Sequence, residues 1–470
     1  MIGRVAEVEE LNRLFDSDES EFVAVYGRRR VGKTYLVRET FGERFTFQHT
    51  GLPNATMQRQ ISHFFKSLKE QGCTEKRCPK DWFEAFDMLR GIIASCSEPR
   101  KVVFIDELPW MDTPRSEFLS ALESFWNEWA SARKDVLFVI CGSASSWIVK
   151  RLFRNRGGLH NRVTARIRLQ PFTLGECERY VQERGLAMTR KDIAECYMAM
   201  GGVPYYWRHL VKGLSVAQNF NRIFFADGAP LRGEFAELYS SLFRNAAHHV
   251  KVVSALAGKK MGMSRAEIAD ATGLEESGQL TDTLETLEES GFIRRYRAFG
   301  MKRRNSLYQL IDNFTLFHFK FLDGVTTDSR FWTATVSSPL QTAWRGLAFE
   351  QLCLLHLDQM RDALKIGGVR TEAFAWRHVG DEVHPDGAQI DLLLDRADNV
   401  INVCEMKYAQ GLYAIEAKTA EGLAQKMETF RSVTKTRKAL HLTMVTSNGL
   451  VHNAYWGSVQ AEVTLDDLFA

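Results

Sequence analysis

The sequence predicts an α/β fold with several domains, and three observations support this prediction. Runs that are typical of buried parallel strands, apolar at every position except Lys101, occur at 22–25, 101–105 and 136–141. Two segments between the first and second runs, 57–68 and 82–94, carry apolar residues at helical spacing, as expected of helices that cover a sheet. The chain has 470 residues, which is enough for about three domains with separate cores.

Composition and charge limit the class of protein. Apolar residues make up 45% and charged residues 25% of the chain, which is typical of a soluble globular protein. No stretch approaches the ~20 apolar residues of a membrane helix, and the N-terminus lacks a signal-peptide core, so we expect a cytoplasmic protein with no membrane partner. The eight cysteines are scattered and predict reduced thiols. A net charge of +3 does not by itself indicate a nucleic-acid partner.

A glycine-rich motif follows the run at 22–25. It has the spacing GxxxxGK(S/T) and lies between a predicted strand and a predicted helix. The glycines let successive backbone N–H groups point at phosphate oxygens, Lys33 would reach the terminal phosphates, and Thr34 would offer a hydroxyl to Mg²⁺. We therefore predict ATP and Mg²⁺ as cofactors. The predicted nucleotide-binding residues are Gly27, Arg28, Arg29, Arg30, Val31, Gly32, Lys33 and Thr34.

Two acids end the run at 101–105. The carboxyl ends of parallel strands are where ligands bind in open α/β sheets. We predict that Asp106 orients Mg²⁺ and its waters, and that Glu107 polarises the attacking water. The alternative is a buried strand that ends in two solvated acids.

The run at 136–141 ends in a glycine and a serine. A hydroxyl at the carboxyl end of a strand beside the Asp-Glu strand could sense the terminal phosphate, and Ser143 is the candidate, with Ser145 behind it. A helix cap is the alternative role for this serine.

Four arginines precede a further predicted strand at 165–169. We expect Arg162 to reach a phosphate on a neighbouring subunit as an arginine finger, which would make the protein a homo-oligomer. The other three, Arg151, Arg154 and Arg156, fit a solvated basic loop.

These motifs resemble AAA+-type P-loop ATPases of the archaeal kind, which are related to the signal-transducing STAND class. The resemblance implies a P-loop NTPase core of five strands, with the P-loop strand and the Asp-Glu strand separated by another, followed by a helical lid. In that family a Gly-Gly-x-Pro segment of the lid touches the nucleotide base, which adds Pro204 to the predicted nucleotide-binding residues. A lid arginine of the sensor kind is not evident, and Arg208 is the one candidate. The residues that carry the resemblance are Gly3-Arg4, Glu7, the P-loop, Ile105-Asp106-Glu107, Gly142-Ser143, Arg162, Leu169-Gln170-Pro171-Phe172 and Gly201-Gly202-Val203-Pro204.

The segment 245–312 predicts three helices and a hairpin. Ser264 and Glu267 form a capping box that opens a helix at 265–271, and leucines at 280, 284 and 287 mark the next helix. The strands at 293–297 and 306–310 would form the hairpin. This order resembles a winged helix-turn-helix.

The charges on this segment argue both for and against DNA binding. Acids on the would-be recognition helix, around 280–289, and just before it would repel DNA phosphates in a major groove, whereas the basic hairpin could contact the backbone. The alternative is a packing and relay module without a nucleic-acid role. The acids are Glu275, Glu276, Asp282, Glu285, Glu288 and Glu289, and the basic residues, expected near the hairpin tip, are Arg294, Arg295, Arg297, Lys302, Arg303 and Arg304.

A helix after Pro339 carries an acid in a predicted apolar stripe. Because a buried carboxylate without a partner is costly, we expect Glu350 to be compensated. The stripe consists of Ala343, Leu347, Glu350, Leu354 and Leu357.

Two apolar segments, 389–394 and 400–407, flank a turn-rich stretch at 395–399. If they pair across this five-residue loop, Asp391 lies opposite Val403, and alternation puts Asp391, Glu405 and Lys407 on one face. Carboxylates suit Mg²⁺, and a lysine beside the metal could help to generate or orient hydroxide.

This constellation resembles the PD-(D/E)xK nuclease superfamily. The matching residues are Glu350, Asp391 and Glu405-Met406-Lys407; Pro385-Asp386 is a second possible leading acid, but Asp391 fits the strand better. The resemblance implies metal ligation by Asp391 and Glu405 and catalytic roles for Glu350, Asp391, Glu405 and Lys407. Archaeal-type ATPases often carry such a domain after a winged helix. The competing interpretation is a decayed nuclease fold that keeps these residues for folding or for gripping DNA.

The predicted domains are a P-loop ATPase core at 1–175, a helical lid at 176–244, a winged helix at 245–312, a helical connector at 313–337 and a restriction-endonuclease-like α/β domain at 338–470. Together they predict an ATP-hydrolysing switch that controls a Mg²⁺-dependent nuclease acting on nucleic acid, with DNA favoured. The alternative is a STAND-like regulatory ATPase whose last domain is a catalytically silent DNA- or protein-binding module.

Overall fold

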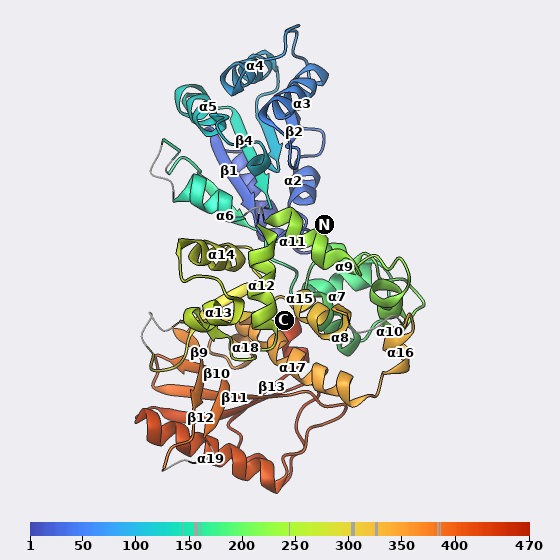
Figure 1. Ribbon diagram of the computed structural model, residues 1–470, viewed down its shortest axis with the longest axis vertical. Coiled ribbons are helices and arrows are strands. Elements are labelled where there is room, and N and C mark those ends of the chain that lie inside the picture. Colours follow the sequence, from blue (N-terminus) through green and yellow to red (C-terminus); the bar gives the residue numbers. More distant parts are fainter. Residues whose placement is uncertain are drawn as a thin grey trace. The chain divides into compact units, whose positions relative to one another are not determined.

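The computed structural model describes residues 1–143, 145–154, 158–159, 161–243, 245–301, 306–324, 328–382, 385 and 387–470 (Figure 1). Backbone contacts divide the chain into two compact units, which we describe separately. The first unit comprises residues 1–171 and 238–246, and the second comprises 172–237 and 247–470. None of the helices in the described ranges is both long and apolar enough to cross a membrane.

A parallel five-stranded sheet forms the centre of the first unit. Its strand order is β2-β3-β4-β1-β5, so β4 separates the P-loop strand β1 from the Asp-Glu strand β3, which confirms the expected arrangement. The sequence analysis named four of these strands but not β2. The strands are β1 (Glu21–Tyr26), β2 (Phe45–Thr50), β3 (Lys101–Asp106), β4 (Val136–Gly142) and β5 (Ala165–Arg168).

Both faces of this sheet are buried, which explains the uninterrupted apolar runs. Along β1, Phe22 and Ala24 pack into one hydrophobic cluster, whereas Val23 and Val25 pack into another. Because strand side chains alternate between faces, every position of such a strand has to be apolar. The helices at 57–68 and 82–94 are confirmed as α3 and α4. The helices of this unit include α1 (Val5–Phe15), α2 (Lys33–Phe41), α3 (Met57–Glu70), α4 (Trp82–Ser95) and α5 (Phe118–Ser124).

The second unit begins with short helices that have well-defined caps. Thr173 and Thr189 each form a capping box at the start of a helix. Gly202 lies against Phe172, since a Cβ atom at this glycine would come within 1.8 Å of the Phe172 carbonyl oxygen. The Gly-Gly-x-Pro segment is thus a tight connection before α9. The helices are α7 (Leu174–Glu183), α8 (Arg190–Met200), α9 (Pro204–Trp207) and α10 (Val216–Phe220).

Three helices and a small antiparallel sheet follow. The capping box of Ser264 and Glu267 is present, and Leu280, Leu284 and Leu287 form the buried face of α14, as expected. The sheet has the strand order β6-β8-β7. The elements are α12 (Ala246–Ala257), β6 (Met263–Ser264), α13 (Arg265–Thr272), α14 (Gly278–Glu289), β7 (Ile293–Arg297) and β8 (Ser306–Leu310).

A mixed five-stranded sheet forms the C-terminal part. Its order is β13-β12-β11-β10-β9, with β9, β10 and β11 antiparallel and β11, β12 and β13 parallel. Helix α19 makes the crossover from β11 to β12 and covers one face through Phe430 and Met427 (Figure 1). The elements are α15 (Asn313–Phe317), α16 (Phe331–Ala334), α17 (Pro339–Leu355), α18 (Leu357–Ala363), β9 (Thr371–His378), β10 (Ala388–Arg396), β11 (Val400–Lys407), α19 (Ala417–Thr434), β12 (Ala439–Thr446) and β13 (Ala461–Thr464).

The expected register of the β10–β11 hairpin is wrong by two residues. Val403 pairs with Leu393, and not with Asp391. The turn is tighter than predicted because Asn399 adopts a left-handed conformation with φ 63°, which lets the strands extend to Arg396 and Val400. A shift of two preserves the face of each side chain, and the register continued by one pair brings Asp391 beside Glu405.

The predicted apolar stripe of α17 is also wrong. The buried face is a neighbouring one that includes Trp344, Phe349, Leu352 and Cys353. Leu347 is 52% exposed, and Glu350 therefore lies at the edge of the core instead of inside it. This placement leaves the carboxylate accessible from a cavity described below.

The end of β7 is attached to the C-terminal sheet. Ala298 forms an isolated bridge with Ala375, and the ring of Phe299 lies 5.6 Å from that of Phe374 and 5.2 Å from that of Phe430. Phe299 thereby joins the hydrophobic cluster under α19.

Candidate functional site

The P-loop connects β1 to α2, and both of its glycines have conformations that other residues adopt only under strain. Gly27 has φ +138°, and a Cβ atom there would lie 2.3 Å from the carbonyl oxygen of Leu169. Gly32 has φ +95° and is the N-cap of α2. The motif therefore encodes a defined loop at a helix N-terminus, which is a geometry suited to phosphate.

Lys33 is buried at the start of α2. Its ammonium donates to the carbonyl oxygens of Gly27 at 3.0 Å and Arg28 at 2.9 Å. Burial lowers the pKa of this lysine, while the nearby carboxylates of Glu107 and Asp106 act in the opposite direction. Of the remaining loop residues, Arg28 and Val31 are buried and Arg29 and Arg30 are half-buried. The ammonium is thus positioned at the loop and surrounded by carbonyl and carboxylate oxygens.

Thr34 and Asp106 are brought together, as predicted. The Thr34 hydroxyl donates to Oδ2 of Asp106 at 2.8 Å. Burial raises the pKa of Asp106, and the hydrogen bond from Thr34 offsets part of this rise. A hydroxyl and a carboxylate side by side are the oxygen donors that Mg²⁺ uses at nucleotide sites, so these two residues fit the predicted metal.

Glu107 contacts the predicted phosphate sensor directly. Its Oε1 accepts from the Ser143 hydroxyl at 2.6 Å and its Oε2 from the Ser143 backbone N–H at 3.1 Å. Glu107 itself has a left-handed conformation with φ 47°, and its N–H donates to Oδ1 of Asp106 at 2.9 Å. Ser143 therefore holds the carboxylate of Glu107 in place, a contact that the sequence analysis did not foresee. The side chain of Ser145 lies outside the described residues.

Arg4 has a contact that motif matching did not reveal. Its guanidinium donates to the carbonyl oxygen of Gln170 at 2.7 Å and to that of Val31 at 3.4 Å. The arginine therefore links the N-terminal segment, the P-loop and the segment after β5. A buried arginine beside a glycine before the first helix is the one sequence signal of this role.

Two further predicted residues are not joined to these by the structure. Arg162 is exposed in the loop before β5, where its N–H donates to the Leu159 carbonyl oxygen. Pro204 is the first residue of α9 and belongs to the other compact unit. Arg156 lies outside the described residues. The arginine-finger and base-contact roles stay predictions.

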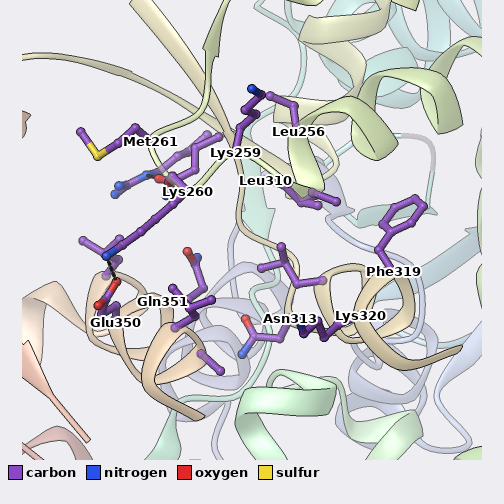
Figure 2. Close-up of a pocket in the computed structure, with 18 of the residues that line it drawn as sticks. Leu256, Lys259, Lys260, Met261, Leu310, Asn313, Phe319, Lys320, Glu350 and Gln351 are labelled. Carbon is purple, nitrogen blue, oxygen red and sulfur yellow. Dashed lines mark hydrogen bonds and ion pairs between the residues drawn. The ribbon is translucent and has the colours of Figure 1, made fainter. Parts of the chain in front are cut away.

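A second cluster of acids lies in the C-terminal part of the chain. Lys260, from the loop between α12 and β6, lies beside Glu350 (Figure 2), with its Nζ 2.6 Å from Oε2 of that residue. The same Nζ lies 3.0 Å from Oδ2 of Asp391. Oδ1 of Asp391 accepts from Gln389 at 2.7 Å. Burial raises the pKa of Glu350, and the ion pair with Lys260 acts against this rise. The compensation expected for Glu350 is therefore supplied by a lysine from outside the predicted nuclease-like domain.

Glu405 has two lysine partners. Nζ of Lys407 lies 2.8 Å from Oε1, and Nζ of Lys426, on α19, lies 2.6 Å from Oε2. Burial acts to raise the pKa of Glu405, but Lys426 and Lys407 outweigh it and the pKa is lowered. Lys426 was missed in the sequence analysis. Among the described residues, His, Cys, Asp and Glu side chains form no group of three or more that could hold a metal ion, and Asp386 is not described.

A cavity of about 540 Å³ adjoins Glu350 and Asp391 within the second unit (Figure 2). Its wall is largely apolar, with Leu256, Leu310, Phe319 and Leu347 among the lining residues. Polar groups at the wall include Lys260, Arg294, Asn313 and Gln351. The two acids are thus accessible from a half-open cavity whose wall carries both acidic and basic side chains.

The basic residues of the predicted wing are engaged where the structure describes them. Arg294 donates to Gln309 at 2.7 Å, Arg297 lies 3.3 Å from a carboxylate oxygen of Glu372, and Arg295 hydrogen-bonds Tyr308. Lys302, Arg303 and Arg304 lie outside the described residues. Arg294 and Arg295 therefore join the two strands of the hairpin, and Arg297 links the hairpin to β9.

The N-terminal fold and the P-loop geometry define a nucleotide-binding domain of the P-loop class. Residues 1–210 match the model of a family described as an ATPase domain predominantly from Archaea. The chain therefore carries an ATPase domain of the archaeal type.

The similarity to known proteins covers more of the chain than this domain. An uncharacterised protein of Methanocaldococcus jannaschii is 24% identical over 402 residues, which cover 81% of this chain and 83% of that protein. The Walker-type ATPase of Pyrococcus abyssi is 17% identical and covers 68% of this chain and 96% of its own, with a TM-score of 0.46. The ORC2 protein of Aeropyrum pernix, in complexes with ADPNP and ADP, is 15% identical and covers 71% of this chain and 95% of its own, with a TM-score of 0.40.

Proposed function

We propose that the protein is an ATP-hydrolysing switch that controls a Mg²⁺-dependent nuclease-like site acting on nucleic acid, with DNA the favoured substrate. The proposal joins the archaeal-type ATPase domain to the carboxylate and lysine cluster of the C-terminal part. The observation that carries it is the gathering of Glu350, Asp391, Glu405 and Lys407 from a helix and two adjacent strands.

The ATPase half of the proposal assigns one task to each residue. Lys33 binds the terminal phosphates of ATP together with the backbone N–H groups of the P-loop. Thr34 and Asp106 would hold Mg²⁺, which supplies positive charge to the phosphates when bound. Glu107 accepts the proton of the attacking water, and Ser143 orients the Glu107 carboxylate. Asp106 and Glu107 lie at the carboxyl end of β3, and Ser143 lies at that of the adjacent strand β4. This arrangement supports the division of roles.

Two further roles complete the nucleotide site in this proposal. Pro204 contacts the base from the lid, and Arg162 reaches the phosphates of a neighbouring subunit in a homo-oligomer. The exposure of Arg162 supports a role outside its own subunit. ATP turnover measured at rising protein concentration, compared between the wild type and Arg162→Ala, tests the second role. The variant is expected to lose turnover at high protein concentration with unchanged ATP affinity, and unchanged turnover would remove this role.

We assign the segment 245–312 as a winged helix that relays movement to the C-terminal part. The order of three helices and a three-stranded antiparallel sheet supports this assignment. The contacts of Arg297 with β9 and of Phe299 with α19 favour packing and relay over DNA reading. The acids of α14 also disfavour entry into a major groove.

The nuclease-like half rests on topology as well as on side chains. Helix α17, the antiparallel strands β9, β10 and β11, the crossover helix α19 and the parallel strand β12 occur in the order expected of a restriction-endonuclease-like domain. Asp391 and Glu405 would hold Mg²⁺, which polarises a phosphodiester and its attacking water when bound. Lys407 holds a proton or orients a water beside Glu405, and Glu350 adds negative charge from α17.

A different function is favoured by one specific observation. Each of the three acids has at least one lysine partner, so the cluster is compensated without a metal ion. A STAND-like regulatory ATPase with a catalytically silent C-terminal module would need such a cluster only for folding or for binding a partner.

A cleavage assay separates the two functions. Supercoiled, linear and single-stranded DNA and RNA are incubated with Mg²⁺, with and without ATP, using the wild type, Lys407→Ala and the exposed-lysine control Lys418→Ala. We expect cleavage by the wild type and the control and loss of cleavage in Lys407→Ala. Absence of cleavage with every substrate would refute the nuclease and favour the silent module.

A further inference from the structure

One lysine ammonium bridges two of the three carboxylates of the C-terminal site. Nζ of Lys260 lies 2.6 Å from Glu350 and 3.0 Å from Asp391. Among the described residues, Lys260 is the one cationic partner of these two acids at ion-pair distance. A positive charge between two carboxylate oxygens occupies the kind of position that a divalent cation takes.

The lysine comes from a different module than the acids. It lies between α12 and β6, whereas Glu350 and Asp391 lie on α17 and β10. Lys407, by contrast, lies on the same strand as Glu405, and Lys426 lies on the crossover helix α19 that packs on the same sheet. The contact of Lys260 is therefore a link between modules.

The backbone around Lys260 is held firmly. Its carbonyl oxygen accepts from Nε2 of Gln309 at 2.6 Å, and the N–H of Gly262 donates to the Lys259 carbonyl oxygen at 2.8 Å. Gly262 has φ +71°, and a Cβ atom there would lie 2.2 Å from the Tyr308 carbonyl oxygen. The loop is thus fixed to β8 and presents this side chain to the acids.

The side chain itself has room to leave. It is 40% exposed and lines the cavity of about 540 Å³, whose wall is largely apolar. The methylene stem of a lysine packs well along such a surface while its ammonium reaches solvent. Breaking the ion pairs of Glu350 and Asp391 with Lys260 therefore requires only rotation of the lysine side chain and no repacking of the core.

We propose that Lys260 is a built-in competitor for the divalent cation at Asp391, with Glu350 as its second anchor, so that the C-terminal site is held closed until this lysine is displaced. The inference rests on the metal site of the proposed function. The regulatory contact of that site is the ion pair of Lys260, which lies in the segment 245–312 that we assign as the relay.

The test measures metal binding directly, without cleavage. The full chain without nucleotide is titrated with Mn²⁺ by calorimetry, using the wild type, Lys260→Ala and Lys260→Gln. Removal of the competing charge is expected to tighten Mn²⁺ binding about tenfold in both variants. Lys259→Ala is the matched control, because Lys259 is the exposed neighbour and has no ion pair with these acids among the described contacts; its Mn²⁺ affinity should equal that of the wild type.

Two additions keep the test decisive. Asp391→Asn on the Lys260→Ala background should abolish the tight binding, which assigns the ion to this cluster. Circular dichroism shows whether each variant is folded. For variants that fold less well, the rise in Tm on adding Mn²⁺ is a second measure of binding, and it should be larger in Lys260→Gln than in the wild type.

The outcomes also separate this inference from the proposed function. Equal Mn²⁺ affinity in the wild type and both Lys260 variants would overturn the inference, while cleavage by the wild type would leave the nuclease intact. Failure of every variant to bind Mn²⁺ at this cluster would overturn both the competitor role and the metal site.

Discussion

The two acid clusters of this protein are compensated in opposite ways. In the ATPase domain, Asp106 and Glu107 are held by neutral donors, namely the Thr34 hydroxyl, Ser143 and a backbone N–H. In the C-terminal part, Glu350, Asp391 and Glu405 are each held by lysine ammonium groups. Burial leaves the pKa of Asp106 raised, whereas the lysines leave that of Glu405 lowered.

The difference lies in the direct partners: the ATPase carboxylates contact neutral donors and interact with the Lys33 ammonium only at longer range, whereas the C-terminal carboxylates contact ammonium groups. Buried carboxylates with neutral partners carry a desolvation cost that a bound metal ion offsets. Carboxylates paired with ammonium groups are stable alone, and a metal ion has to replace those groups. Four predictions test this contrast, from the largest effect to the smallest.

The largest effect is expected on ATP hydrolysis. Glu107→Gln keeps an acceptor for Ser143 but removes the group that takes the proton of water, so turnover should fall about 100-fold or more with ATP affinity retained. Steady-state phosphate release and calorimetric ATP titration measure the two quantities. Normal turnover of Glu107→Gln would show that another residue is the general base.

Loss of Lys33 should act on binding instead. Lys33→Ala removes the buried ammonium at the P-loop, and we expect ATP affinity to fall about 100-fold. The control is Lys66→Ala, whose lysine is exposed on α3. Equal ATP affinity in the two variants would contradict the assignment of the P-loop.

The C-terminal cluster should respond through stability. Glu405→Gln leaves Lys407 and Lys426 beside a neutral amide, without their anionic partner. The free energy of unfolding should therefore fall by about 1–3 kcal/mol. Urea unfolding followed by circular dichroism measures the change. An unchanged unfolding free energy would show that the lysines are fully solvated in solution.

The smallest effect has the opposite sign. Asp106→Asn keeps partners for Thr34 and for the Glu107 N–H but removes a buried charge, so the nucleotide-free protein should gain about 1 kcal/mol of unfolding free energy. The same variant should lose the Mg²⁺ dependence of ATP binding. Destabilisation would mean that the Asp106 charge is compensated by groups other than those described.

The pH dependence of the last two effects follows from the pKa shifts. The pKa of Glu405 is lowered, so its stabilising contribution is complete above its ordinary value of 4.5 and is lost as the pH falls through the folded-state pKa. The pKa of Asp106 is raised above its ordinary value of 3.8, so its cost appears only as the pH rises. In metal-free buffer, both differences from the wild type should shrink toward about pH 3.

The sequence predicted well what depends on neighbouring residues. The P-loop, the apolar runs of β1, β3 and β4 and the capping box at Ser264 are local patterns, because each is set by steric and hydrogen-bonding needs within a few residues. The pairing of Thr34 with Asp106 followed from the rule that parallel strands end at one edge of a sheet.

What depends on tertiary packing was not predicted. The hairpin register depended on a left-handed Asn399, and the buried face of α17 depended on which elements pack against it. Lys260 lies 131 residues from Asp391 and Lys426 lies 21 residues from Glu405, and neither carries a motif. Strand β2 alternates apolar and polar residues too irregularly to stand out.

The insertion of Phe299 under α19 has a practical consequence for anyone who divides this chain. A fragment that starts at residue 338 would lack Phe299 and would present the rings of Phe374 and Phe430 to water. Such a fragment would tend to aggregate, since an exposed aromatic patch invites self-association. The smallest soluble piece that retains the C-terminal acids therefore includes the helices and hairpin that precede it, and any gene fusion that transplants this domain has to carry them along.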